Sequence, residues 1–549
     1  MAERTHLGVP EALIVRAARA KVPGWAAAAD DAAFTLQPLH GGMSNLMFIV
    51  SNHSAGAVSH RRVVARLLSP ALDAVIDRER ESRIVRYLAT SGIGPLLFGT
   101  CSVAPDGALL LSPAATPRAP ASDDARASPR AGPAACTTLR FEAFIDGRTL
   151  TVRDLRDAAA AASVRAHTAA KLAALHAQRP DLREREERAR LRRASACSLD
   201  ALPPPLQPLP QLRPALQRYV DMVAAIGGHA RMRAGAATPA LRELLRGGAR
   251  GVCWPAEAAW LARLMEAHGG PTVLCHGDAQ PGNWIEESRG PHGSVLLKLI
   301  DYEYARYDHR AVDTGNLFCE IALDYNVAEP PGFVMDVGCY PPLEHQRDWL
   351  GHYAAAARDA AAAGSEGHAS GGAAGSGGPP HEAAATPLPP PPDSECDGGC
   401  SGGGGGGGGG SVWQRTTCNA AELARQFPDG ADEGGPHDAP PGVGGGVRQL
   451  AREARLGMLA SHLYWSLWSA IMGAGREGIA VPLPAAAPGG DAAGPAASGA
   501  AAGHVAGDDD ASVSAGHGVF SYASYGLARL REYERLRAQL EADAPEWCA

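Results

Sequence analysis

The first third of the chain alternates apolar and polar positions in short runs, a pattern typical of β-strands. Apolar runs flank a glycine turn in FTLQPLHGGMSNLMFIV, residues 34–50, which predicts a hairpin. RRVVARLLS, from residue 61, predicts a third strand, and LRFEAFIDGRTL, residues 139–150, predicts a strand that leads into a turn. Residues 9–25, before these strands, and residues 76–88, between the third and fourth, carry the apolar spacing of helices that end at Gly or Pro.

Helical spacing dominates the rest of the chain. Residues 151–178 predict one Ala-rich helix, and residues 206–268 predict further helices. Two more follow, VRQLAREARLGMLASHLYWSLWSAIMG from Val447 and FSYASYGLARLREYERLRAQLEAD from Phe520. The pattern therefore predicts an α+β fold of two lobes, a small antiparallel-sheet lobe in residues 1–145 and a larger, mostly helical lobe in residues 146–549.

Low-complexity stretches interrupt this pattern. Residues 114–135, about 364–446 and about 474–517 are rich in Ala, Gly and Pro, and the second stretch includes an unbroken glycine run from Gly402 to Gly410. Such segments bury too little apolar surface to offset chain entropy. We interpret them as disordered inserts, which reduces the 549 residues to one two-lobed unit.

Composition excludes several function classes. A formal net charge of -8 provides no basic surface for nucleic acid, and no apolar run approaches the length of a membrane span. The start of the chain lacks the apolar core of a secretory signal, so we expect a cytoplasmic protein, with organelle import left open. The 11 cysteines lack paired CxxC spacing, which favours reduced thiols over a metal site. Lys occurs only at Lys21, Lys171 and Lys298, and no GxxxxGK[ST] loop occurs, so a phosphate-binding cation is expected to be an Arg.

The candidate chemistry lies in 273-VLCHGDAQPGNWI-285 and 297-LKLIDYEYARYDHRAVDTGN-316. Phosphoryl transfer from ATP to an alcohol needs a carboxylate for the hydroxyl, a divalent metal and a cation. Asp278 fits the first role, and Asn283 and Asp301 offer the oxygen ligands that Mg²⁺ prefers. The alternative is that HGD is a turn and IDYE a strand cap. Their joint occurrence in this order, behind a glycine-turn lobe, favours the kinase hypothesis.

The sheet lobe supplies candidates for the phosphates. Ser44 and Asn45 lie in a Gly-rich turn whose backbone N–H groups would cover the phosphates, although, taken alone, this turn is better explained as a plain hairpin turn. Arg66, on the next predicted strand, is the candidate cation. Glu81, on the first long helix, would orient Arg66 as its carboxylate partner, and a solvated helical charge is the alternative.

Aromatic residues gather near acids in a chain that is only 5% aromatic. Aromatic faces beside carboxylates can bind a quaternary ammonium group by cation–π attraction. An ordinary helical core stripe is the competing explanation for Trp465 and Trp468. The candidates for such a cage are Tyr304, Tyr325, Trp465, Trp468, Tyr522 and Tyr525.

Taken in order, these motifs resemble the choline/ethanolamine kinase family, within the protein-kinase-like and aminoglycoside-phosphotransferase-like folds. The similarity runs through LHGGMSN, VVARL, IDRERESRIVRYLATSGIGP, FEAFIDGRTL, LCHGDAQPGN, LIDYEYARYDHRAVDTGNLFCE, ASHLYWSLWSA and FSYASYGLARLREYERL. Two features depart from the family: its usual His-Asn-Asp is His276-Gly277-Asp278 here, and the Gly-rich inserts are not family features.

The resemblance implies a role for each matching residue. Asp278 would be the catalytic base with Gln280 beside it, and Asn283 and Asp301 would ligate magnesium. Arg66 would bind the ATP phosphates beneath the nucleotide-covering lobe of residues 1–145. The backbone from Glu142 through Phe144 to Ile145 would meet adenine. The amino-alcohol pocket would be lined by Glu320, Tyr304, Tyr325, Trp465, Trp468, Tyr522 and Tyr525.

The implied activity is ATP-dependent phosphorylation of choline, and also of ethanolamine, as the first step of CDP-choline phospholipid synthesis. Gln280, Tyr522 and Tyr525 favour choline. An ethanolamine-selective kinase, another small-molecule kinase of the aminoglycoside-phosphotransferase type and a catalytically inactive binding protein remain as alternatives. The implied cofactors are ATP and Mg²⁺. Family members often form homodimers, which the residues do not test.

Overall fold

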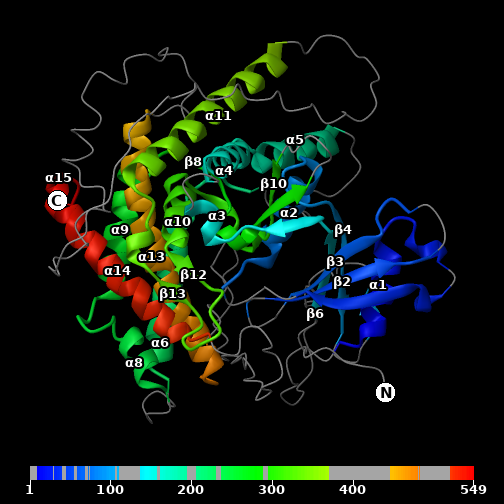
Figure 1. Cartoon of the computed structure of the whole chain (residues 1–549), viewed down its shortest axis with the longest axis horizontal. Coiled ribbons are helices and arrows are strands. Elements are labelled where there is room, and N and C mark those ends of the chain that lie inside the picture. The colour runs from blue at the N-terminus through cyan, green and yellow to red at the C-terminus, as the bar shows by residue number, and fades with distance from the viewer. Residues whose placement is uncertain are drawn as a thin grey trace, which may run out of the picture.

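A six-stranded antiparallel sheet and a larger assembly of helices form the structure (Figure 1). This computed structural model describes residues 9–28, 30–39, 45–54, 58–68, 72, 75–104, 108–110, 137–156, 161–193, 206–229, 237–288, 295–369, 446–479, 481 and 520–548. The α+β class predicted from the sequence is confirmed.

The described strands are β1 (Phe34–Leu39), β2 (Asn45–Asn52), β3 (Arg62–Leu68), β4 (Leu97–Val103), β5 (Leu109–Leu110), β6 (Thr137–Ala143), β7 (Gly147–Thr149), β8 (Thr272–Cys275), β9 (Trp284–Ser288), β10 (Val295–Leu299), β11 (Arg306–His309), β12 (Leu323–Asp324) and β13 (Val334–Met335). The described helices are α1 (Glu11–Lys21), α2 (Arg78–Thr90), α3 (Val152–Arg156), α4 (Ala161–His176), α5 (Pro180–Arg193), α6 (Leu212–Gly227), α8 (Pro239–Leu245), α9 (Trp254–His268), α10 (Ala311–Ile321), α11 (Leu343–Ala369), α13 (Val447–Arg476), α14 (Tyr522–Asp543) and α15 (Pro545–Cys548).

The large sheet has the strand order β1-β2-β3-β6-β4-β5, and every pair in it is antiparallel. Alternate residues of its strands point to one face, where Val50, Ala65 and Phe141 are buried with Ile14 and Trp25 from the α1 segment. The predicted hairpin and third strand are confirmed in register, because β2 pairs with both β1 and β3.

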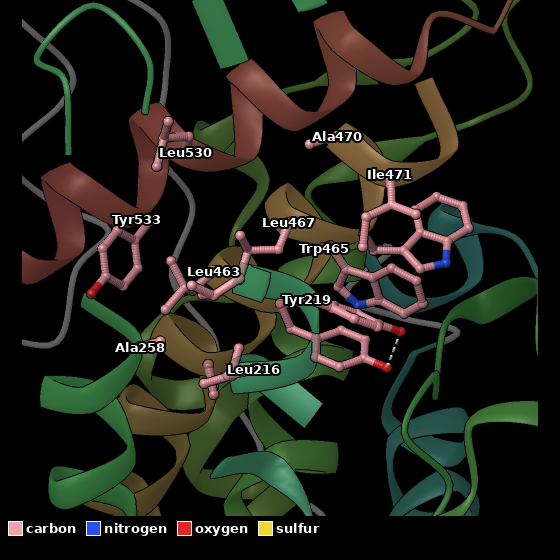
Figure 2. Close-up of a cluster of buried hydrophobic side chains, with 14 of the residues drawn as sticks. Leu216, Tyr219, Ala258, Leu463, Trp465, Leu467, Ala470, Ile471, Leu530 and Tyr533 are labelled. Atoms are coloured by element: carbon pink, nitrogen blue, oxygen red, sulfur yellow. Dashed lines mark hydrogen bonds between the residues drawn. The ribbon is translucent and has the colours of Figure 1, made fainter. Parts of the chain in front are cut away.

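The helical part packs around α13, a 30-residue helix that is buried along most of its length. Figure 2 shows its apolar side chains meeting Leu216 and Tyr219 of α6, Ala258 of α9 and Leu530 of α14. Smaller sheets, β10-β9-β7 and β11-β8, carry the loops that follow β8 and β10. Over the described residues, no helix has the combined length and apolarity needed to cross a bilayer.

Some element bounds differ from the predictions. The single helix predicted over residues 151–178 is two helices, α3 and α4, and α11 continues to Ala369, past the predicted start of the second insert. Insert 114–135 and most of the inserts 364–446 and 474–517 lie outside the described residues. The lobe boundary at Ile145 stays a prediction.

Two glycines bring α10 and α13 into backbone contact. A Cβ on Gly315 of α10 would lie 2.0 Å from the carbonyl carbon of Gly457 in α13, and a Cβ on Gly457 would lie 1.8 Å from the Ala311 oxygen. Neither side can yield, because the opposing atoms are backbone. These glycines therefore fix how closely the two helices approach.

Gly457→Ala should lower the free energy of unfolding by about 1–3 kcal/mol or more, because overpacking forces the helices apart. Gly351→Ala, within α11, is the matched control, since its Cβ would meet nothing within 4 Å. The free energy of unfolding of this control should rise by up to about 1 kcal/mol, because Ala has a higher helix propensity than Gly. Denaturant unfolding measures both, and equal stabilities for the two variants would contradict the close contact.

Candidate active site

The loop that follows β8 is held by one buried carboxylate. Asp313 of α10 accepts the backbone N–H of His276 at 2.7 Å and that of Gly277 at 2.8 Å, one on each carboxylate oxygen. Gly277 has φ +83°, a conformation that glycine adopts without strain. Asp313 thus fixes the position of the backbone immediately before Asp278.

Two histidines complete this anchor. His176 lies 3.0 Å from Asp313 through Nε2 and 2.7 Å from the Tyr353 hydroxyl through Nδ1. Burial alone would raise the pKa of Asp313, but the bonds from His176 and the loop amides hold it below its usual value. Burial lowers the pKa of His276, whose neutral ring joins the two loops by donating from Nε2 to the Ile300 carbonyl at 2.8 Å.

His176, Asp313 and the buried Cys275 lie close enough together to suggest a metal site. Both Asp313 oxygens already accept hydrogen bonds, and both His176 nitrogens have partners. Burial also raises the pKa of the Cys275 thiol well above its usual value, so the thiolate that binds metals is disfavoured. This cluster is a structural anchor.

Asp278 lies beside the two other polar residues of its loop. Gln280 Nε2 donates to its Oδ2 at 3.1 Å, and Asn283 Nδ2 donates to the same oxygen at 3.1 Å and to the Asp278 carbonyl at 2.8 Å. Burial, followed by the negative charge of Glu320, raises the pKa of the Asp278 carboxyl to about 8. A carboxylate that holds its proton this strongly is suited to accept one from an alcohol.

Asp301 follows β10 in a strained backbone conformation. Its φ of 67° is the one left-handed value at a non-glycine residue among the described residues. The Ile300 N–H donates to the Asn283 carbonyl at 2.9 Å, which brings the two loops together, and Asp301 Oδ1 accepts from Arg66. Strain of this kind persists where surrounding contacts enforce it, often at functional sites.

Arg66 belongs to a buried chain of alternating charges. Arg140 Nε lies 2.7 Å from Glu142, and Arg140 Nη1 lies 2.6 Å from Glu81. Glu142 in turn lies 3.9 Å from Arg66, which reaches Asp301. The predicted pairing of Glu81 with Arg66 is therefore corrected: Glu81 contacts Arg140 and Arg78 instead, and its charge acts on Arg66 without direct contact.

The residues present fit a magnesium ion and a nucleotide. Asn283 uses Nδ2 for its hydrogen bonds to Asp278, and Arg66 binds Oδ1 of Asp301, so Asn283 Oδ1 and Asp301 Oδ2 are the oxygens that these bonds do not use, on two residues that line the same cleft. Two such oxygens, completed by phosphates and water, are a usual Mg²⁺ environment. Arg66 Nε is buried without a hydrogen-bond partner among the described residues, so it can still donate to a phosphate oxygen.

These groups open onto one cleft of about 500 Å³. Its walls include Arg66 and the Glu142–Ile145 segment, the loops at Asp278 and Asp301, and an aromatic group with Glu320. The rings of Tyr304 and Trp465 meet edge to face at 5.1 Å, and Trp465 meets Trp468 at 5.2 Å. Most predicted site residues therefore line one cavity: Asp278, Gln280, Arg66, Glu142, Phe144, Ile145, Asn283, Asp301, Tyr304, Glu320, Tyr325, Trp465, Trp468 and Tyr525.

Three predicted residues lie outside the cleft lining, and a fourth is not described. Ser44 is outside the described residues. Asn45 donates to Glu303 at 2.9 Å, and Glu81 is at the far end of the charge chain. Tyr522 does not line the cleft but packs edge-on against Trp468 at 5.5 Å, supporting the cage from behind.

Sequence reasoning missed Arg140, Asp313 and Arg529. Arg140 could have been found, because alternation on a strand puts it on the same face as Glu142. Asp313 lies within the quoted motif, but its role depends on a contact with a loop 36 residues away. Arg529 of α14 is fully buried against Glu320, but the same helix carries three other arginines, and its pattern does not show which of the four is buried.

Comparison with known proteins shows which family the chain is similar to. A family model described as choline/ethanolamine kinase matches residues 36–103 and 138–534. A human choline/ethanolamine kinase is 27% identical over 325 residues, 58% of this chain and 63% of the relative, so the alignment spans under two thirds of that protein. A probable choline kinase of Arabidopsis thaliana is 24% identical over 60% of this chain and 70% of its own.

A solved structure supports the fold. The crystal structure of choline kinase from Cryptosporidium parvum matches with a TM-score of 0.50 at 15% identity, over 98% of this chain and 99% of that one. At that identity the likeness bears on the fold alone, which is the two-lobed α+β architecture expected from the sequence. Since the family model covers most of its length, the chain belongs to the choline/ethanolamine kinase family.

Proposed function

We propose that the protein transfers the γ-phosphoryl group of ATP to the hydroxyl of choline, with ethanolamine as a second acceptor. The observation that carries this proposal is the position of Asp278 in the shared cleft. Cationic and acidic groups suited to phosphates and a metal line the cleft with it, and so do aromatic rings suited to an ammonium group. The names of the human and Arabidopsis relatives support the same activity.

The hydroxyl of the bound alcohol would lie against Asp278. Its carboxylate accepts the hydroxyl proton as the alcohol oxygen attacks the γ-phosphorus, and Gln280 and Asn283 fix the orientation of the carboxylate through their bonds to Oδ2. Because burial and Glu320 raise the pKa of Asp278, the proton is held more firmly than an exposed Asp would hold it.

Arg66, Asn283 and Asp301 would hold the phosphates and the metal. Arg66 donates to phosphate oxygens through its guanidinium, and the backbone of Glu142–Ile145 lies at the cleft wall where an adenine can bind. Asn283 Oδ1 and Asp301 would ligate Mg²⁺, which when bound offsets the negative charge of the phosphates. The product would be a phosphomonoester such as phosphocholine, the first intermediate of CDP-choline phospholipid synthesis.

Purified protein with ATP, Mg²⁺ and choline should form phosphocholine, and Asp278→Asn should lower kcat by about 10²–10⁴-fold, the usual contribution of a positioned base. Product formation is measured by mass spectrometry, with an aminoglycoside panel as the alternative acceptors. Asp278→Asn should stay folded at pH 8, because the amide removes a carboxyl whose ionised form burial disfavours. If wild type and variant form no phosphomonoester from choline or ethanolamine, the proposal is wrong.

Trp465→Leu should raise the KM for choline by about tenfold, the range of one cation–π contact, while the KM for ATP changes by less than about twofold. Trp260→Leu is the control, because Trp260 lies on α9 under Arg537 and does not line the cleft. Steady-state kinetics with each substrate varied in turn separates the two constants. Equal changes in both KM values would indicate a general loss of structure instead of a lost ammonium contact.

A further inference from the structure

The Glu320 carboxylate lines the cleft with the aromatic rings, and each of its two oxygens accepts a hydrogen bond from another side chain. Arg529 of α14 donates to Oε1, and the Tyr325 hydroxyl donates to Oε2 at 2.8 Å. Arg529 and Glu320 are 0% and 1% exposed, so water screens their attraction little. The negative charge of Glu320 is thus offset within the protein before any substrate arrives.

Arg529 is itself fixed from several sides. Its Nε and Nη2 donate to the Tyr525 hydroxyl at 3.0 and 2.7 Å, and Nη1 lies 3.4 Å from the Ser461 hydroxyl. The hydroxyls of Tyr525 and Tyr325 are 3.1 Å apart. The hydroxyl groups of both tyrosines are therefore engaged with Arg529 and Glu320. This leaves the aromatic rings of the two tyrosines to contact a ligand in the cleft.

Other carboxylates of the cleft are engaged as well. Asp301 pairs with Arg66, Glu142 with Arg140, and Glu303 accepts from Asn45. Asp324 is half-exposed on β12, and its Oδ1 accepts the Asn326 N–H at 2.9 Å. Asp324 is therefore the competing acceptor that an experiment must separate from Glu320.

We infer that Arg529 sets the amine specificity of the site by holding Glu320 neutralised, so that quaternary ammonium alcohols are preferred over primary amines. A quaternary ammonium has no N–H and binds ring faces by cation–π attraction. A primary ammonium brings three N–H donors, and each donor that finds no acceptor in the buried site costs desolvation. Arg529 is a positioning residue for this choice, and the inference rests on the proposed function.

The test compares kcat/KM for choline and for ethanolamine at saturating MgATP. Arg529→Met releases a charged acceptor for the primary ammonium, so the choline-to-ethanolamine ratio should fall about tenfold, the range of one charge-assisted hydrogen bond. Arg529→Met/Glu320→Gln removes both charges and should return the ratio to within about twofold of wild type. A purely structural role for Arg529 would lower both activities together and leave the ratio unchanged.

Two further variants keep the inference falsifiable if Arg529→Met fails to fold. Arg529→Lys retains the charge, but an ammonium cannot reproduce all the contacts that the guanidinium makes with Glu320 and Tyr525, so the ratio should fall about threefold. Arg535→Met removes another α14 arginine from its Glu532 pair away from the cleft and should leave the ratio unchanged.

A ratio that stays within about twofold of wild type in folded Arg529 variants overturns the inference while leaving the kinase activity intact. The inference is also overturned if Asp324→Asn changes the choline-to-ethanolamine ratio and Arg529→Lys does not. Asp324 would then be the residue that distinguishes the two amines. Wild-type protein that phosphorylates neither alcohol overturns the proposed function itself.

Discussion

The site depends on a buried chain of charges that runs from α2 across the sheet to the loop after β10. Arg66 and Arg140 stand directly opposite each other on β3 and β6, where like charges repel. Glu142 lies between the two guanidiniums. At one end of the chain Glu81 pairs with Arg140, and at the other end Asp301 pairs with Arg66. Removing one member would leave a buried charge uncompensated, so helix, sheet and loop must keep their relative positions. Of these residues, Arg66, Glu142 and Asp301 line the cleft.

One helix applies a comparable constraint to the rest of the cleft. Asp313 and Glu320 lie seven residues apart on α10, so they share one face about two turns apart. Asp313 holds the loop that presents Asp278, and Glu320 joins the aromatic wall through Tyr325 and Arg529. Gly315, between them, brings α10 against α13, which carries Trp465 and Trp468. The separation between the Asp278 loop and the aromatic wall therefore depends on a single helix, α10.

The sequence was sufficient for the elements and for the residues of the two loops. Apolar periodicity located the strands, and the loop motifs identified Asp278, Asn283 and Asp301, because local pattern determines local structure. The partners of charged residues were not predictable in the same way. Glu81 was expected to pair with Arg66 but binds Arg140, since the choice depends on strand register and helix placement. Tyr522 was expected in the cage and supports Trp468 instead, because spacing on α14 does not reveal which face meets the cleft.

Gly277 is the position at which the loop after β8 departs from the His-Asn-Asp expected from the family resemblance, and its surroundings explain why glycine fits there. The position requires φ +83°, which glycine adopts freely and Asn tolerates better than other residues. A Cβ here would lie 2.5 Å from the Tyr304 carbonyl and 3.0 Å from the Tyr304 Cβ. Glycine therefore allows the loop after β8 to pack closely against Tyr304, whose ring lies in the aromatic wall of the cleft. Gly277 N–H donates to Asp313, and Gln280 and Asn283 donate to Asp278. None of these hydrogen bonds involves a side chain at position 277, so the residue there affects packing against Tyr304 and not the hydrogen bonds that hold Asp278.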